Sequence, residues 1–523
     1  MRILVTGGSG VVGTATVTEL LRRGHTVRLV SRHAADDARR WASGVEPHPG
    51  SITDPDSLRG AANGCAALIH LAAVVAETPP DETFERVNVE GTRHVIEEAV
   101  RGGVVRSVYV SSLGADRGTS PYHRSKRTGE EIALASTMNT TVIRLANVYG
   151  PGDEVISLLI KMIRMLPIVP TIDGGEDVFQ PIWVGDAAMA LAEALDRPEL
   201  AGQALDVAGP DRTCMNDLIT QVRHITGRRP MTLPVSGALA TLGAKLASMA
   251  GVSIPIDEGQ ITMLEEGNVI PDDRQNALTE ILGIEGTRLT DGLCKLADAL
   301  PEQLPDAGVG SLRRKRIWAD ITDSSLSPEQ LFERFRTTFS DVTPWSMNLG
   351  AEPGTPDALQ EGETMTMSLP IRGNVQVRVE ELTPRTVTLV TLEGHPLAGA
   401  VRFLVEQRGD HLRFEVQVYD RPADVADWLV MRTVGQYIQL GTWKSIVRRV
   451  IQESGGRCAD GIHHETVSLD EEAAERIETW LRELVLARQR EEVPHDGAER
   501  EDASRQDAIR QDATPQDVTP ERA

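Results

Sequence analysis

Cysteine is scarce in this sequence, and the few cysteines are far apart. The 523 residues contain only Cys65, Cys214, Cys294 and Cys458, with no Cys-x-x-Cys pair among them. This spacing excludes the disulfide framework of a small secreted domain, and it favours buried free thiols in a reducing compartment.

Basic residues are also fewer than acidic ones. Lysine and arginine together number 54 against 77 aspartates and glutamates, which gives a formal net charge of −23. A general affinity for nucleic acid is therefore not expected. Hydrophobic residues make up 40% and charged residues 25% of the chain, as in ordinary globular proteins, and the length predicts two or three domains.

No uninterrupted apolar run is long enough to cross a membrane. The longest apolar stretch, Val235 to Val252, is broken by Lys245 and is rich in glycine and alanine, so we expect a packed helix rather than a transmembrane segment. The chain begins directly on a strand-like segment, which leaves no room for a signal peptide. We therefore expect a cytoplasmic protein.

The first thirty residues carry the strongest local pattern. Ile3 to Val5 are a short aliphatic run typical of a buried parallel strand, and a second such run follows at Thr26 to Val30. Between them, a glycine-rich turn leads into a helical pattern. Gly7 permits the tight turn, Gly10 lets a pyrophosphate approach the backbone, and Gly13 lets helix and strand pack closely. The pattern predicts a dinucleotide-binding unit.

The end of the second strand indicates which dinucleotide is bound. It reads Ser31-Arg32-His33, without the acidic residue that enzymes preferring NAD place here for the ribose hydroxyls. The guanidinium of Arg32 can pair with a 2′-phosphate instead. The sequence therefore favours NADP(H) over NAD(H), and a strand-capping surface role for Arg32 is the alternative.

Residue types suited to proton transfer follow farther along the chain. A strand expected over 107–110 ends on Ser111 and Ser112, and a predicted helix begins with the pattern Tyr122-x-x-x-Lys126. Residues four apart lie on one helix face. A nearby ammonium and a positive nicotinamide would lower the phenol pKa from its usual value of about 10. Ser112, at the strand end, can hold a substrate oxygen at the phenol.

Taken in chain order, these motifs resemble those of the short-chain dehydrogenase/reductase superfamily, in its extended or atypical branch of NAD(P)-dependent epimerases and dehydratases. The matching segments are TGGSGVVG, HLAA, NVEGT, VYVSS, YHRSK, VIRLANVYGPG and FQPIWVGDAA. The resemblance covers residues 1–300, and its later part is most similar to a subgroup that resembles the nucleotide-binding accessory subunit of respiratory complex I. It implies a Rossmann fold, a doubly wound parallel sheet, with a substrate lid mainly in 151–300.

The resemblance also implies roles for individual residues. Ser112, Tyr122 and Lys126 would be catalytic, with Ser111 replacing Ser112 if the strand register is shifted by one. The cofactor-binding positions would be Gly7, Gly10, Val11, Val12, Gly13, Arg32, Ser51, Ile52, Leu71, Ala72, Ala73, Asn88 and Lys126. Asn147 would contact the substrate, a small molecule with a carbonyl or hydroxyl group. Family members commonly form homodimers through the helices after Asn88 and Tyr122.

Two positions depart from the pattern of that family. Ser51 stands where an acid usually reads the adenine amine, which makes it a weaker substitute. The segment between Ser112 and Tyr122 is shorter than in many sugar-nucleotide enzymes, which counts against a UDP-sugar substrate. Asp116 is the only acid in this short segment, and a dehydratase usually needs an acid or base beyond the tyrosine.

Three local helices are expected around these motifs. One begins at Asp54, which is followed by proline at the first helical position. The helix after Asn88 should bury Val95, Ile96, Ala99 and Val100. A helix over 156–166 carries Lys161 and Arg164, for which we expect a solvated face.

A second unit is expected after a linker over 301–316, whose basic run at 311–316 we expect to form a surface turn. From 317 to 455, a capped helix at Ser327 precedes several alternating strands, and a long helix over 424–453 follows. This order resembles an α+β START-like, or helix-grip, domain, in which a curved sheet and a long helix enclose an apolar ligand pocket.

The chain is expected to end in a C-terminal helical region over 456–490, with a docking stripe at Ile477, Trp480, Leu481 and Leu484, followed by a disordered acidic tail over 491–523. No metal site is expected. His395 and the pair His463-His464 are better explained as turn residues than as ligands.

Together these patterns predict an NAD(P)-dependent oxidoreductase or epimerase/dehydratase. Two other functions stay open. One is a non-catalytic NADPH-binding scaffold or assembly factor like the complex I subunit, against which Ser112, Tyr122 and Lys126 argue. The other is a carrier of a lipid or quinone ligand through the C-terminal domain.

Overall fold

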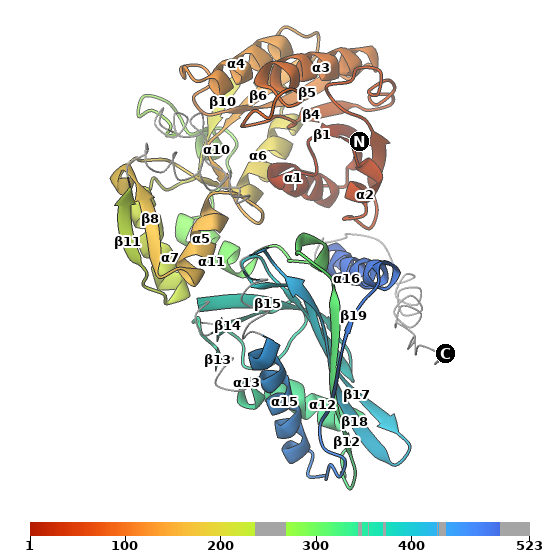
Figure 1. Ribbon diagram of the computed structural model, residues 1–523. Coiled ribbons are helices and arrows are strands. Elements are labelled where there is room, and N and C mark those ends of the chain that lie inside the picture. Colours follow the sequence, from red (N-terminus) through yellow and green to blue (C-terminus); the bar gives the residue numbers. More distant parts are fainter. Residues whose placement is uncertain are drawn as a thin grey trace.

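The structure is a computed structural model that describes residues 1–235, 268–343, 348–353, 355–369, 373–425, 427 and 436–491. Within these ranges the chain forms two units, one Rossmann-like with its lid and one built on an antiparallel sheet (Figure 1). Three expectations fall outside them: the apolar helix after Val235, most of the first half of the helix over 424–453, and the tail from 492 onward.

Seven strands form the sheet of the N-terminal unit, in the order β10-β6-β5-β4-β1-β2-β3, and each neighbouring pair is parallel. The strand order reverses between β1 and β4, and doubly wound sheets bind ligands at the carboxyl ends of strands at such a point. The predicted parallel sheet is confirmed. The strands are β1 (Arg2–Thr6), β2 (Thr26–Ser31), β3 (Val45–Pro49), β4 (Ala67–His70), β5 (Arg106–Ser112), β6 (Asn139–Leu145) and β10 (Ala204–Val207).

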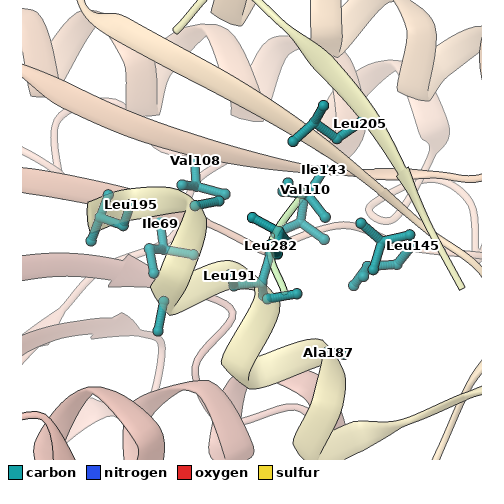
Figure 2. Close-up of a cluster of buried hydrophobic side chains, with 14 of the residues drawn as sticks. Ile69, Val108, Val110, Ile143, Leu145, Ala187, Leu191, Leu195, Leu205 and Leu282 are labelled. Carbon is teal, nitrogen blue, oxygen red and sulfur yellow. The ribbon is translucent and has the colours of Figure 1, made fainter. Parts of the chain in front are cut away.

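Helices cover both faces of this sheet because the strands are apolar on both sides. On one face, α6 (Val184–Asp196) presents Ala187, Leu191 and Leu195 to strand residues that include Val108 and Ile143 (Figure 2). The other face packs against a second buried cluster that includes Val95, Ile96 and Ala99. The remaining helices of this layer are α1 (Val11–Arg22), α2 (Ala34–Ala38), the π-helix η1 (Phe84–Gly91), α3 (Thr92–Arg101) and α4 (Pro121–Leu134).

One local helix prediction is wrong, and one residue of another helix is exposed where burial was expected. The residues after Asp54 form successive turns, and Gly60 has a φ of +83° that no helix continues through. The side chain of Glu98 accepts hydrogen bonds from the backbone N–H groups of Gly60 and Ala62 at 2.8 and 3.3 Å. Glu98 is therefore buried on α3, whereas Val100, expected on the inner face, is 40% exposed.

The lid is built around a small apolar core of its own. Its short strands pair in parallel, β7 with β9 and β8 with β11, and the predicted helix over 156–166 is confirmed as α5. The elements are β7 (Val148–Tyr149), α5 (Ile156–Met165), β8 (Ile168–Ile172), η2 (Asp173–Gly175), β9 (Ile182–Trp183), η3 (Pro198–Leu200), α7 (Met215–Thr226), β11 (Met231–Val235), α10 (Ala277–Glu280) and α11 (Leu289–Asp298).

The C-terminal unit is an eight-stranded antiparallel sheet in the order β13-β14-β15-β16-β17-β18-β12-β19. The strands expected from alternation are all present. The elements are η4 (Pro305–Ala307), β12 (Arg313–Ile321), α12 (Pro328–Thr337), α13 (Phe339–Val342), β13 (Asn348–Leu349), β14 (Thr364–Leu369), β15 (Gly373–Leu382), β16 (Thr386–Thr391), β17 (Leu397–Arg408), β18 (His411–Pro422), α15 (Gln436–Glu453), β19 (His463–Ser468) and α16 (Glu471–Glu491).

Helices pack on both faces of this sheet. α12, α13 and α15 share one buried cluster with the sheet, in which the Phe335 ring lies 5.0 and 5.1 Å from those of Phe403 and Phe414. The opposite face packs against α16 through Ile477, Leu481 and Leu484. The docking stripe expected on the C-terminal helix is confirmed.

The basic run before the second unit is a strand and not the expected surface turn. β12 begins at Arg313. Lys315 is buried and donates to both carboxylate oxygens of Asp420 at 2.7 Å, while Arg316 pairs with Glu415 at 2.6 Å. Basic residues fit this strand because the neighbouring β18 supplies the matching carboxylates.

The two units are joined through the lid helix α5, which contradicts the solvated face expected for Lys161 and Arg164. The Arg164 side chain is only 2% exposed and makes a bidentate pair with Glu352, at 2.8 and 2.7 Å. It also donates to Gln376 of β15 at 2.7 Å. Lys161 pairs with Glu393 at 2.6 Å. The C-terminal unit therefore holds the lid directly.

Three smaller expectations can be checked. His463 and His464 lie in β19, paired with β12, and not in a turn. The four cysteines are free, but only Cys65 is buried and Cys294 is exposed. Across the described ranges, no three histidine, cysteine, aspartate or glutamate side chains gather as a metal site would need, and none of the helices there is long and apolar enough to span a membrane.

Candidate active site

The glycine turn after β1 has the geometry that a pyrophosphate site requires. Gly7 has a φ of +72°, and a Cβ on Gly13 would lie 2.0 Å from the Gly7 carbonyl oxygen. A Cβ on Gly10, in contrast, would meet nothing closer than 3.6 Å, so this position is open. Helix α1 starts here without a side-chain cap or an acid in its first turn. Its first N–H groups therefore suit an anion.

The end of β2 places Arg32 on the surface, where its side chain is 71% exposed and pairs with Glu82 at 3.3 Å. An acid missed by the sequence analysis also reaches this point. The hydroxyl of Ser31 donates to the carboxylate of Asp37, which lies in α2. Both an accessible guanidinium and a carboxylate thus lie where the adenosine ribose of a dinucleotide would be read.

The two serines at the end of β5 have different partners. Ser111 donates to Glu130 of α4 at 2.6 Å, and the same carboxylate accepts two hydrogen bonds from Arg144 at 2.9 and 2.7 Å. Ser112 instead lies close enough to the phenol of Tyr122 to lower its pKa, and its own hydroxyl donates to the Leu113 carbonyl at 3.5 Å. The structure thus brings Ser112, and not Ser111, together with the tyrosine.

Tyr122 and Lys126 lie one turn apart on α4. Burial raises the pKa of Tyr122, and the nearby Ser112 hydroxyl opposes that rise. The lowered phenol pKa expected from the sequence is therefore not produced by the chain itself. Lys126 is buried, its Nζ donates to the Val110 carbonyl at 2.7 Å, and burial lowers its pKa to about 8.

A buried hydrogen-bond chain braces the crevice between β1 and β4. Thr92 donates to the Asn88 carbonyl at 2.7 Å, so its oxygen accepts from Nε2 of His70 at 3.0 Å. Nδ1 of His70 then accepts from Thr6 at 2.6 Å. Burial, with a smaller effect of Lys126, lowers the pKa of His70 to about 3. The ring is therefore neutral, as this series of hydrogen bonds requires.

Asn88 connects the segment after β4 to helix α4. Its side chain bonds both the N–H and the carbonyl of Val74 at 2.8 and 3.0 Å, and it donates to Ser125 of α4 at 3.0 Å. The segment after β4 is thereby fixed against α4. Leu71, Ala72 and Ala73 lie at the start of that segment and are half-buried.

The other predicted positions are placed as follows. Ser51 contacts Thr53 at 2.9 Å, and the carbonyl of Ile52 accepts from His94. Asn147 follows β6 at the same edge of the sheet and accepts a hydrogen bond from Asn268 at 2.5 Å. Asn268 was not identified from the sequence, because 121 residues separate it from its partner.

Asp116, the acid of the short segment, is held in an ion-pair cluster. Arg274 lies 2.6 Å and Arg144 3.2 Å from its carboxylate. Burial tends to raise the pKa of Asp116, but these two arginines together with Arg117 bring it below its usual value. A carboxylate kept ionised in this way is a poor proton donor.

Comparison with known proteins gives one family and several relatives. The model of the NAD dependent epimerase/dehydratase family matches residues 3–208. A ceramide reductase of Caulobacter vibrioides is 30% identical over 46% of this chain and 76% of that protein. The mitochondrial NADH dehydrogenase (ubiquinone) 1 alpha subcomplex subunit 9 of Arabidopsis thaliana is 26% identical over 51% and 69%. A 3 beta-hydroxysteroid dehydrogenase/Delta 5-->4-isomerase of Mycobacterium tuberculosis is 34% identical over 29% and 48%.

Proposed function

Because the chain belongs to the NAD dependent epimerase/dehydratase family, we propose that it is an NADP(H)-dependent oxidoreductase acting on a carbonyl or hydroxyl carbon. The observation that carries the proposal is the approach of Ser112, at the end of β5, to the phenol of Tyr122, with Lys126 on the same helix as the tyrosine. Ser112 ends β5, and Tyr122 and Lys126 lie on α4, the helix that follows it; β4 separates β5 from β1, the strand that leads into the glycine turn.

Each residue of the site has a distinct task in a reduction. The bound nicotinamide supplies the hydride. Tyr122 gives its phenolic proton to the substrate oxygen, and the raised pKa keeps that proton in place at neutral pH. Ser112 donates to the same oxygen and holds it at the phenol. The ammonium of Lys126, one helical turn away, favours the phenolate that remains.

The state of Asp116 favours oxidation and reduction over dehydration. A dehydratase needs a second group that can donate or accept a proton at a neighbouring carbon. The arginines around Asp116 occupy its carboxylate and keep it ionised. The tyrosine is then the proton donor and acceptor of the proposed site.

An apolar carbonyl compound is the substrate class that we propose. The short segment between Ser112 and Tyr122 argues against a nucleotide sugar, as stated above. The relatives named for ceramide and 3 beta-hydroxysteroid substrates act on largely apolar molecules. A screen of long-chain and cyclic ketones with NADPH tests this class, and turnover restricted to sugar nucleotides would contradict it.

Replacing Arg32 with alanine should weaken NADPH binding about 10-fold or more and leave NADH binding unchanged. A hydrogen-bonded ion pair with the 2′-phosphate contributes about 1.5–3 kcal/mol, and NADH lacks that phosphate. Fluorescence titration with both nucleotides measures the effect, and the matched variant is Asp37→Asn, at the carboxylate that accepts from Ser31. Tighter binding of NADH by the wild type, lost in Asp37→Asn, would assign the cofactor to NAD(H).

The two serines should respond differently to the same substitution. Ser112→Ala should lower kcat about 10²–10³-fold, because it removes a donor aimed at the reacting oxygen. Ser111→Ala should mainly cost about 1–3 kcal/mol of stability, because it takes a hydrogen bond from the buried Glu130. Steady-state kinetics and denaturant unfolding on both variants separate these effects, and the reverse pattern would assign the role to Ser111.

A non-catalytic scaffold is the second candidate, because the complex I subunit of Arabidopsis thaliana is among the relatives. Such a protein would bind NADPH without turnover of any carbonyl compound.

The C-terminal unit adds a further proposal. Among its described residues, the order of one strand, two helices, six strands and a long helix supports a START-like fold, and lipid co-purifying with the full chain would test a ligand pocket there.

A further inference from the structure

The C-terminal helix α16 contacts both units of the protein. Leu481 and Leu484 bury its inner face against the antiparallel sheet. Near its end, Arg488 is buried and donates to Glu380 of β15 at 2.6 Å and to Glu302 at 2.6 Å. The helix is therefore a rigid extension of the C-terminal unit, and it runs past the edge of the sheet toward α2 (Figure 1).

The last turns of α16 reach the segment that follows β2. Glu483 forms an ion pair with Arg39, and Nε of Arg490 donates to the Arg39 carbonyl oxygen at 2.8 Å. Glu483 and Arg490 are seven residues apart and so lie on one face of the helix. Both contacts are made to the residue that directly follows α2.

Within the N-terminal unit, the segment over 31–41 is held by the buried Ala34 and Trp41 and by the pairing of its first residue with β3. α2 is only five residues long, which is too short to be stable by itself. Inside the N-terminal unit, Arg40 and Trp41 donate to Thr14 and Thr18 of α1 at 3.0 Å each. Arg39 lies at the end of α2 and is partly exposed, so its contacts with α16 add to the support of the segment that carries Arg32.

We propose that Glu483 and Arg490 of α16 are positioning residues for the adenosine end of the cofactor, acting through Arg39 and α2 on the segment that carries Arg32. This inference rests on the proposed function, because it assumes that 31–41 reads a dinucleotide. It makes cofactor affinity a property of both units.

The test uses the full-length protein and the double variant Glu483→Gln with Arg490→Ala. Fluorescence titration should show NADPH binding weakened about three- to tenfold, with a matching rise in KM for NADPH and an unchanged kcat. The matched control is Glu478→Gln, which removes an ion pair of the same helix with Arg421 inside the C-terminal unit and should leave both constants unchanged. The charge-exchanged variant, Arg39→Glu with Glu483→Arg, keeps an ion pair at this contact. It should therefore bind NADPH more tightly than the double variant does.

A second measurement is independent of nucleotide binding. Amide hydrogen exchange over 33–41, without cofactor, should be faster in the double variant than in the wild type and in Glu478→Gln. Wild-type affinity and unchanged exchange in the double variant would overturn the inference. So would an equal loss in Glu478→Gln, because the effect would then be general destabilisation. A wild type that binds neither NADPH nor NADH would instead overturn the proposed function, and the inference with it.

Discussion

Replacing Tyr122 with phenylalanine should lower kcat for a carbonyl substrate about 10²–10⁴-fold, the usual contribution of a positioned acid. The substitution removes only the phenolic oxygen, which lies close to Ser112. The ring keeps its contacts with Phe84 and His123, so the fold and the affinity for NADPH should stay as in the wild type. Steady-state kinetics and a nucleotide titration on the same preparation measure both quantities.

Tyr149→Phe is the matched control for this experiment. Tyr149 is a buried tyrosine of the lid core, and it packs against Trp183. The same atom is removed there, away from Ser112, so turnover should change little. If Tyr122→Phe retains turnover of a genuine substrate, the assignment of the proton donor is wrong. If the wild type binds NADPH tightly but converts no ketone, the scaffold function is favoured.

Replacing Arg164 with alanine should lower the free energy of unfolding by about 3–5 kcal/mol, the usual cost of removing one partner from a buried ion pair. The substitution would leave the buried carboxylate of Glu352 without its bidentate partner and remove hydrogen bonds to Gln376 and to the Ala297 carbonyl. Because these groups join the lid to the C-terminal unit, separate unfolding of the two units should appear in a denaturant titration.

Lys161→Ala provides the comparison on the same helix. The pair of Lys161 with Glu393 is partly exposed to solvent, and such pairs contribute at most about 1 kcal/mol. The double variant Arg164→Met with Glu352→Leu should recover most of the stability, because it removes both buried charges together. A loss below about 1 kcal/mol in Arg164→Ala would show that Glu352 finds another partner or water.

Patterns between near neighbours in the chain were predicted well. The glycines of the turn act as their spacing indicated, because Gly7, Gly10 and Gly13 are all placed by one turn and one helix end. The strands of both sheets follow from apolar runs and alternation. Tyr122 and Lys126 share a helix face because that spacing is a property of any helix.

Predictions failed where interactions with residues far away in the sequence override a local pattern. The segment after Asp54 carries a helix-start signal, yet Gly60 and the carboxylate of Glu98 stabilise turns instead. The basic residues at 313–316 look like a surface turn until β18 supplies Asp420 and Glu415. Local preferences amount to a few tenths of a kcal/mol per residue, and buried partners outweigh them.

The sequence by itself therefore determined the dinucleotide turn, the parallel sheet and the candidate tyrosine and lysine. Only the tertiary structure decided that Ser112 and not Ser111 contacts Tyr122, that Asp116 is held by arginines, and that Arg164 joins two units. The physical reason is the range of the interactions. Helix and turn geometry depends on residues within one turn of each other, whereas the partner of a buried charge is set by packing between segments far apart in the chain, such as Arg164 and Glu352, 188 residues apart.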